Sequence, residues 1–383
     1  MAQRHLPNTM PLQPLTADTT ALLRQSLEDI VQQNPPLDEH QDSLSGLLSG
    51  HTALAYLFLR TAQEHAGLQV RGHGCKYWAE RYMAGDRGAQ EIQDRNCGLA
   101  CEKLAFEAVR ACVTGSERDV AAFLDNIPGL AAREKAFPSE MLYGRAAVLY
   151  MLRMVRRFVP SSAGPVDEAI GRICQRILDT RDSSEGDWLW HGKRYYGAPH
   201  GDVGIITQLV LSDPSLAPRL AARLGELLDL QTEGGNWPST AEARERADRL
   251  VQFCHGAPGF IFALQSLRPF YPMLRERIDE AIAKGRRVIW ARGLLVKEPC
   301  LCHGLFGNGL NTRALPRGEK RDHFLSLATP DSLQRLRSDH PGLFRHGSCG
   351  TSSSPLFSYL PSAAWTWTVS NEDEPRIILF NDV

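Results

Sequence analysis

The sequence contains no apolar run long enough to cross a membrane. A membrane-spanning helix needs roughly 20 consecutive apolar residues, and the longest candidates here, at 53–59 and 205–211, are far shorter. The opening residues Met1-Ala2-Gln3-Arg4 also lack the apolar core of a signal peptide. We therefore expect a cytoplasmic protein with at most a peripheral association with the plasma membrane.

The chain also lacks an excess of charge of either sign. Its 43 Lys and Arg residues against 44 Asp and Glu residues give a formal net charge of -1. Proteins that bind nucleic acid irrespective of sequence neutralise phosphates with many basic side chains, so this balance argues against nucleic acid as a partner. Hydrophobic residues make up 43% of the chain, which is typical of a folded globular protein. Small molecules or peptides are the expected partners.

Paired C-x2-C motifs, the usual signature of a structural zinc site, are absent among the nine cysteines, and the odd cysteine count argues against a complete disulfide framework. Instead, Cys254-His255-Gly256 and Cys302-His303-Gly304 form two matching triplets, each opening an H-G-x-x-G pattern. A catalytic zinc site has three protein ligands and one open position, and zinc favours thiolate and imidazole. Cys254, Cys302 and His303 would supply such a set. Cys300 is interpreted as a bystander.

A glycine opens a strongly apolar segment seven times along the chain. The seven positions are Gly50, Gly98, Gly144, Gly201, Gly256, Gly304 and Gly347. Their spacing of 43 to 57 residues suits one helical hairpin with its loops. A simple turn would explain any one of these glycines, but it would not explain seven regular copies or the histidine that precedes the last four.

The segments that follow these glycines are apolar on nearly all sides, which predicts buried helices. Segments between them, such as those beginning at Pro165 and Leu274, carry an apolar stripe at helical spacing and predict an outer layer. Together they predict an all-α fold, a double-layered α/α toroid of seven helical hairpins in one domain over 1–383. We expect segment 1–18 and tail 366–383 to pack on or extend from it, the tail as an extended or partly ordered end, and 314–331 to be a surface insertion.

In such a toroid the starts of the inner helices converge, which would bring the residues just before each glycine together. Zinc deprotonates a bound thiol at neutral pH, so the predicted site points to sulfur chemistry. His200 and His255 occupy corresponding positions before their glycines and suit the acid and base of a conjugate addition. His346 holds the equivalent place in the last copy. For any one of these residues taken alone, burial in the core is the simpler explanation.

Several stretches resemble the lanthionine synthetase C-like family. They are Leu250 to Gly259 (LVQFCHGAPG), Leu301 to Gly304 (LCHG) with Gly307-Asn308, and Glu140 to Ala146 (EMLYGRA). Asn236-Trp237-Pro238-Ser239 and the opening Met1 to Arg4 with Pro7-Asn8 are similar to its eukaryotic branch. Phe253, Ala147 and Leu305-Phe306 depart from the family pattern, and His346 replaces an acidic residue.

The resemblance implies an α/α toroid with zinc held by Cys254, Cys302 and His303. It also implies a catalytic role for His200, a place in the site for His255, and glutathione-binding roles for Arg4 and Lys297, whose charges suit that acidic tripeptide. The expected reaction is zinc-dependent addition of glutathione, or of a peptide cysteine thiol, to dehydroalanine or dehydrobutyrine in a peptide or protein.

Two alternatives to this reaction stay open. The protein could be a glutathione-binding adaptor or redox-signalling protein with a zinc site and little turnover. Some α/α toroids hydrolyse sugars, but that chemistry requires paired carboxylates, and the residues expected to converge here are cysteines and histidines.

Overall fold

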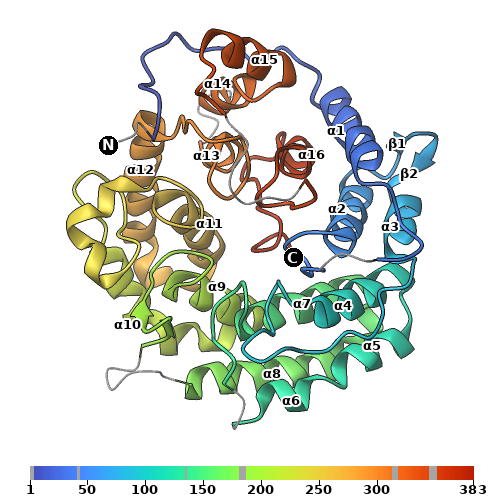
Figure 1. Cartoon of the computed structure of the whole chain (residues 1–383). Helices are drawn as coiled ribbons and strands as arrows, with labels where there is room; N and C mark the ends of the chain where they lie inside the picture. Colours follow the sequence, from blue (N-terminus) through green and yellow to red (C-terminus); the bar gives the residue numbers. More distant parts are fainter. Residues whose placement is uncertain (1–3, 41–43, 134–135, 181–186, 313–317, 345–351) are drawn as a thin grey trace.

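The helices of the chain form a closed ring (Figure 1). The computed structural model describes residues 4–40, 44–133, 136–180, 187–312, 318–344 and 352–383. In this part of the chain, seven inner helices each contact the next, and the last contacts the first. They are α2 (His51–Glu64), α4 (Glu102–Thr114), α7 (Arg145–Phe158), α9 (Asp202–Ser212), α11 (Ala257–Leu267), α13 (Leu305–Asn311) and α16 (Tyr359–Val369). The predicted α/α toroid is confirmed.

An outer layer of helices covers this ring. Its members are α1 (Thr19–Gln33), α3 (Cys75–Met83), α5 (Glu117–Leu124), α6 (Ile127–Ala131), α8 (Ala163–Asp179), α10 (Ala217–Asp229), α12 (Arg275–Arg292), α14 (Glu319–Ser326) and α15 (Pro330–Asp339). Most inner helices pack on the outer helix that follows them, whereas α16 packs on α1. The two ends of the chain therefore close the ring together.

The predicted division into inner and outer helices follows the apolar pattern. In α7 every residue from Arg145 to Val155 is buried, because neighbours surround this helix on all sides. The outer helix α8 buries only one face, which includes Val166, Ile170, Ile173 and Ile177. This is the stripe that the sequence predicted.

The motif glycines stand at the starts of inner helices, where backbone segments pass very close to each other. Gly256 precedes α11 with a φ of 106°, a conformation that side chains with a Cβ rarely adopt. A Cβ at Gly307, the second glycine of its motif, would lie 1.9 Å from the Leu301 carbonyl oxygen. The prediction that each motif glycine opens an inner helix was wrong at Gly98, because α4 begins only at Glu102. Gly347 lies outside the described residues.

Two predictions about the last part of the chain were wrong. The tail 366–383 is not an extended end: α16 runs to Val369, and Ile377–Phe380 are buried. Figure 1 shows the C-terminus at the centre of the ring. Within 314–331, the described residues include α14, whose Phe324 and Leu325 are buried on the core. Both segments look polar in sequence because their apolar residues come in short groups.

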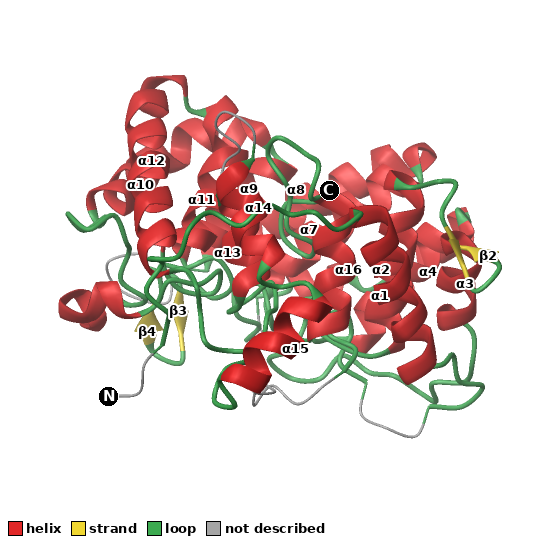
Figure 2. Ribbon diagram, turned by 90° about the horizontal axis from the view of Figure 1, so that it is seen from above, coloured by secondary structure: helices red, strands yellow, loops and turns green. Residues whose placement is uncertain are grey.

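Two short antiparallel hairpins complete the fold, β1 (Gln69–Val70) with β2 (His73–Gly74) and β3 (Leu189–Trp190) with β4 (Lys193–Arg194). Figure 2 shows β3 and β4 on the side of the molecule where long loops gather. No helix in the described part of the chain has the length and apolar character to span a membrane.

Candidate functional site

Cys254 and Cys302 meet where the loops before α11 and α13 run together. The backbone N–H of Cys254 donates to the carbonyl oxygen of Cys302 at 3.4 Å, and Gln252 Nε2 donates to Cys254 Sγ at 2.9 Å. A hydrogen bond from the Cys302 side chain lowers the pKa of Cys254 against the opposing effect of burial, and the charge of Lys297 adds to this lowering. Two of the three predicted zinc ligands are therefore in contact, with one thiol biased towards its thiolate form.

His303 follows Cys302 directly, and its ring stacks on Phe357 with the centroids 6.0 Å apart. Burial, and then the charge of Lys297, lower the pKa of His303 to about 4, so the imidazole is neutral at pH 7. Among the described residues no group of three or more His, Cys, Asp and Glu side chains is arranged to hold a metal ion. The structure thus brings the two thiols together but does not gather the His303 imidazole into one cluster with them.

The side chains of this region include the types of donor that zinc requires. Thiolate and neutral imidazole are the ligands zinc prefers, and both are present on one pair of loops. Cys300, two residues before Cys302, is fully buried, and burial raises its pKa to about 12. Its sulfur accepts the backbone N–H of His303 at 3.4 Å, so it supports the loop. The thiol pair fits a zinc site, and the imidazole would have to turn towards it.

His200 lies at the start of α9 beside a buried carboxylate. Its Nδ1 is 2.6 Å from Glu140 Oε2, and because a carboxylate only accepts, Nδ1 carries the proton and Nε2 is left for other partners. Glu140 is 2% exposed and also accepts the backbone N–H groups of Leu142 and Tyr143, which fix its position. Glu140 was not predicted as a site residue. The signal available in the sequence was an acidic residue four positions before Gly144, within the EMLYGRA stretch.

Aromatic rings hold both candidate catalytic histidines. The Tyr143, Trp190 and His200 rings form a parallel stack, with centroid distances of 5.5 and 5.4 Å. Tyr195 contacts the His200 ring at 5.9 Å and the His255 ring at 6.0 Å. His200 and His255 therefore lie on the same part of the molecule, as predicted. Trp190 and Tyr195 come from the β3–β4 hairpin and the residue after it, which the sequence motifs did not indicate.

The histidine pair and the thiol pair share one region of the structure. Cys254 and His255 are adjacent, and the segment leading to His200 packs on them so closely that a Cβ at Gly197 would lie 2.4 Å from the Cys254 carbonyl oxygen. Burial, followed by the charge of His200, lowers the pKa of His255 to about 4. His255 Nδ1 is buried and has no hydrogen-bond partner among the described residues. His346 lies outside those residues.

Basic side chains line a pocket of about 400 Å³ near this region. Arg4, Lys193 and Arg249 contribute the positive charges, and Glu242 contributes a carboxylate. The backbone holds Arg4 in place, because its carbonyl oxygen accepts the N–H of Val296 at 3.1 Å. Val296 directly precedes Lys297 in the chain, so the two residues predicted to bind glutathione come from adjoining segments. Lys193 and Arg249 were not predicted.

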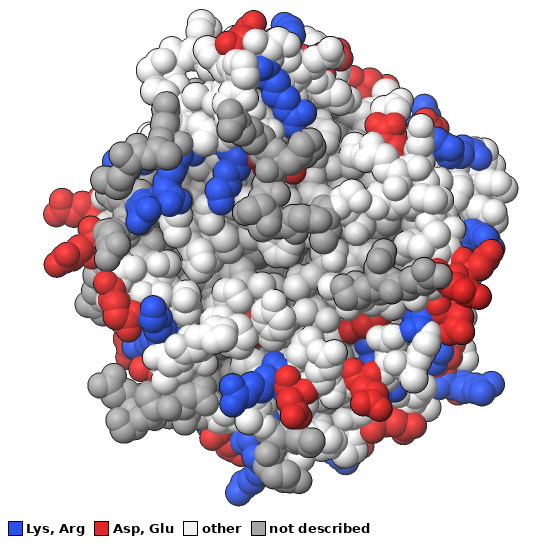
Figure 3. Space-filling model, viewed as in Figure 1, with Lys and Arg blue, Asp and Glu red and all other residues white. Residues whose placement is uncertain are grey.

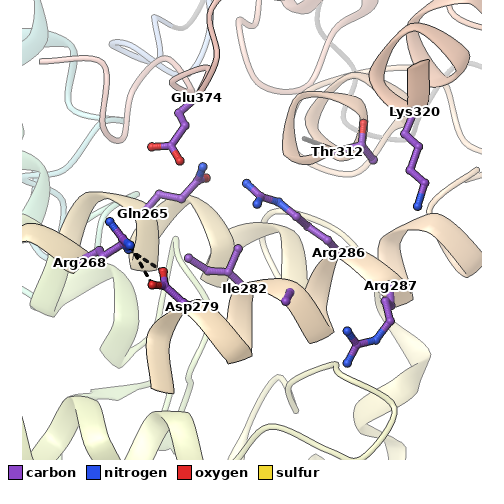
Figure 4. Close-up of a pocket in the computed structure, with 10 residues that line it drawn as sticks. Gln265, Arg268, Asp279, Ile282, Arg286, Arg287, Thr312, Lys320 and Glu374 are labelled. Carbon is purple, nitrogen blue, oxygen red and sulfur yellow. Dashed lines mark hydrogen bonds and ion pairs between the residues drawn. The ribbon is translucent and has the colours of Figure 1, made fainter. Parts of the chain in front are cut away.

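A second basic pocket, of about 500 Å³, lies elsewhere (Figure 4). Arg286, Arg287 and Lys320 line one part of it, and an Arg268–Asp279 ion pair lines another. None of the candidate site residues that the structure describes belongs to this pocket. Figure 3 shows the face seen in Figure 1, on which charged side chains of both signs gather mainly around the rim of a hollowed centre.

Comparison with known proteins agrees with the fold and the motifs. Residues 109–359 match the model of the family described as lanthionine synthetase C-like protein. "Glutathione S-transferase LANCL1" of Danio rerio is 32% identical over 205 residues, 49% of this chain and 49% of that protein. "LanC-like protein GCL1" of Arabidopsis thaliana is 30% identical over 179 residues, 44% of this chain and 40% of that protein. The matched regions thus span about half or less of either relative.

A solved structure, nisin cyclase, superposes with a TM-score of 0.58 at 11% identity, covering 92% of this chain and 95% of that one. At such low identity the likeness shows the fold alone, and it agrees with the toroid described above. The family match covers well over half of the chain and includes both Cys-His-Gly motifs. The chain belongs to the lanthionine synthetase C-like family.

Proposed function

We propose that this protein is a zinc-dependent enzyme that adds a thiol to dehydroalanine or dehydrobutyrine in a peptide or protein, with glutathione as the first thiol to test. The observation that carries the proposal is the contact of Cys254 with Cys302 beside the Glu140–His200 pair. The name of one relative, a glutathione S-transferase, supports thiol chemistry of this class.

Cys254, Cys302 and His303 would hold the zinc ion. When bound, zinc would stabilise the thiolate form of an incoming thiol at neutral pH. The other roles in the reaction would be filled by side chains around the zinc ion. Gln252 orients Cys254 through its hydrogen bond to the sulfur, and Phe357 packs on the ring of His303.

His200 is the proposed proton donor and acceptor. In the addition, sulfur bonds to the β-carbon of the electrophile, the carbon–carbon double bond opens, and the α-carbon takes up a proton. The proton lost by the thiol balances the one gained by the α-carbon. Glu140 fixes the tautomer and the ring orientation of His200, as a buried carboxylate does for a catalytic histidine. His255, on the other side of Tyr195, is the second candidate for proton transfer.

Glutathione carries two carboxylates and one ammonium group, so it needs more than one basic partner. Arg4, Lys193 and Arg249 line one pocket, and Lys297 adds its charge beside Cys254. Charge-assisted hydrogen bonds from these groups would hold the carboxylates. Glu242, in the same pocket, would suit the ammonium group.

The decisive test incubates the full chain with glutathione and a dehydroalanine peptide and looks for the thioether adduct by mass spectrometry. We expect adduct formation by the wild type, slower formation by His200→Asn, and unchanged formation by His340→Asn, a matched change at an exposed position. Glutathione binding by calorimetry should survive His200→Asn. Binding of glutathione with no adduct from any dehydroamino-acid peptide would instead support the adaptor function and contradict the enzyme.

A further inference from the structure

An extended segment near the start of the chain carries Arg4 to its pocket. Residues 4–17, all of which the structure describes, contain no helix, and α1 begins only at Thr19. Figure 1 shows this dark blue segment running along the rim of the ring from α12, past α14 and α15, to α1. We name residues 4–17 the N-terminal strap.

Few contacts hold the N-terminal strap on the helices. Each of its residues is exposed or only partly buried. The backbone N–H of Leu6 donates to the carbonyl oxygen of Leu294 at 2.7 Å. Further along, a pocket of about 460 Å³ lies between the strap and the start of α15. A segment with so few buried contacts opens readily, so the bonds that fix it decide how often Arg4 is in place.

One histidine of α14 bonds to the N-terminal strap at two points. His323 is fully buried. Its Nδ1 is 3.1 Å from the backbone nitrogen of Gln13, and its Nε2 is 2.9 Å from Oδ1 of Asn8. Because a backbone N–H can only donate, Nδ1 accepts, and Nε2 therefore carries the proton that is donated to Asn8. A single ring thus joins two separate points of the strap.

The surroundings of His323 favour this pattern of bonds. The centroid of its ring lies 5.3 Å from that of Trp290, on α12. Burial lowers the pKa of His323, so the ring is neutral at pH 7 and Nδ1 keeps its lone pair. Asn8 Nδ2 donates to the carbonyl oxygen of Trp290 at 3.0 Å. The strap is therefore tied to α12 and α14 at once.

We propose that His323 is a positioning residue, which anchors the N-terminal strap and thereby keeps Arg4 at the pocket proposed for glutathione. His323 does not line that pocket and acts through the strap. A ligand binds less tightly when the state that binds it is populated for only part of the time, in proportion to that fraction. The affinity for glutathione thus depends on bonds made on α14. This inference rests on the proposed function, which assigns Arg4 to glutathione.

The first test follows the strap itself, by hydrogen–deuterium exchange and mass spectrometry of the purified chain without glutathione. We expect His323→Ala to speed exchange in peptides that cover 4–17 and 293–298 at least about fivefold, because the strap loses two hydrogen bonds. Asn8→Ala should speed it in the same peptides. This second variant changes a partly buried strap residue and leaves the core intact, so it decides the question even where His323→Ala does not fold.

Two further variants separate the anchor from a general loss of a histidine contact. His65→Ala is the matched control, because it removes a ring whose Nε2 is 3.0 Å from the carbonyl oxygen of Thr368, outside the strap. It should leave exchange of the strap unchanged. His323→Asn can place an acceptor where Nδ1 stood, so it should recover part of the protection that His323→Ala loses.

The second test measures glutathione. By calorimetry, His323→Ala and Asn8→Ala should raise the Kd for glutathione at least about threefold, while kcat at saturating glutathione stays within about twofold of wild type. An Arg4→Ala/His323→Ala variant should bind glutathione no more weakly than Arg4→Ala, because the anchor acts through Arg4.

Unchanged strap exchange in both His323→Ala and Asn8→Ala would overturn the proposal. So would a double variant in which the effects of Arg4→Ala and His323→Ala on the Kd simply multiply. Faster strap exchange in a protein that binds no glutathione would support the anchor and contradict the proposed function alone.

Discussion

Replacing Asp382 with alanine tests whether the C-terminal segment holds the centre of the ring together. The carboxylate of Asp382 is fully buried and accepts hydrogen bonds from Tyr56 Oη at 2.8 Å, Tyr150 Oη at 2.9 Å and Arg60 Nε at 3.0 Å. Burial, and then the nearby carboxylate, raise the pKa of both phenols well above the ordinary value, so they remain donors. Residues from α2, α7 and the tail meet at this one group.

The size of the expected effect follows from these contacts. Removing one member of a buried ion pair costs about 3–5 kcal/mol, because the remaining charge is left unpaired. Arg60 keeps a partner in Glu64 at 3.1 Å, and the Tyr150 hydroxyl, 2.7 Å from that of Tyr56, can donate its proton there instead, which favours the lower end of this range. At about 2.1 cal/mol/K of unfolding entropy per residue, a loss of about 3 kcal/mol lowers the thermal midpoint by about 4 °C.

Differential scanning calorimetry at pH 7 measures this change. The control is Glu372→Ala, which breaks the half-exposed pair that Glu372 forms with Arg376 at 2.8 Å and should cost less than about 1 kcal/mol. Asp382→Asn retains an acceptor but loses the charge, so its thermal midpoint should fall between those of Asp382→Ala and Glu372→Ala. A thermal midpoint for Asp382→Ala no lower than that of Glu372→Ala would refute the structural role of the buried carboxylate.

Three further predictions concern the motif loops and the site. Gly307→Ala places a Cβ 1.9 Å from the Leu301 carbonyl oxygen and should destabilise the fold by about 3 kcal/mol or more. Gly171→Ala, with open space around it, should stabilise the fold slightly. Thermal unfolding of the two variants measures this difference. Glu140→Gln should lower kcat for glutathione addition about 10- to 100-fold with little change in the KM for glutathione, and an unchanged kcat would remove Glu140 from the mechanism. Arg4→Ala should raise the KM for glutathione about tenfold at constant kcat, and calorimetry of glutathione binding checks the same contact.

The layered helices could be predicted because their signals are local. An inner helix such as α7 is apolar on all sides, an outer helix such as α8 carries one apolar stripe, and both patterns are set by which neighbours surround each helix. The motif glycines could also be recognised, because close backbone approach leaves no other residue possible at positions such as Gly307. Both Cys-His-Gly motifs were expected at the starts of inner helices, and this expectation predicted that Cys254 and Cys302 lie together.

The features that the sequence did not reveal depend on long-range contacts. Glu140 accepts two nearby backbone N–H groups, but its partner His200 is 60 residues away, so no spacing pattern links them. The tail was misjudged because Asp382 appears polar in isolation, while its partners Tyr56 and Tyr150 lie on helices from the first half of the chain. The basic pocket likewise joins Arg4 to residues near position 250.

Zinc content is the most direct test of the account. The purified chain should contain about one zinc ion by plasma mass spectrometry, and a Cys254→Ala/Cys302→Ala variant should contain none. A Cys75→Ala/Cys174→Ala variant, which removes two buried thiols outside the site, should keep the full amount. Zinc retained after loss of Cys254 and Cys302, or absent from a wild type purified in zinc-supplemented medium, would contradict the assignment of the thiol pair as a metal site.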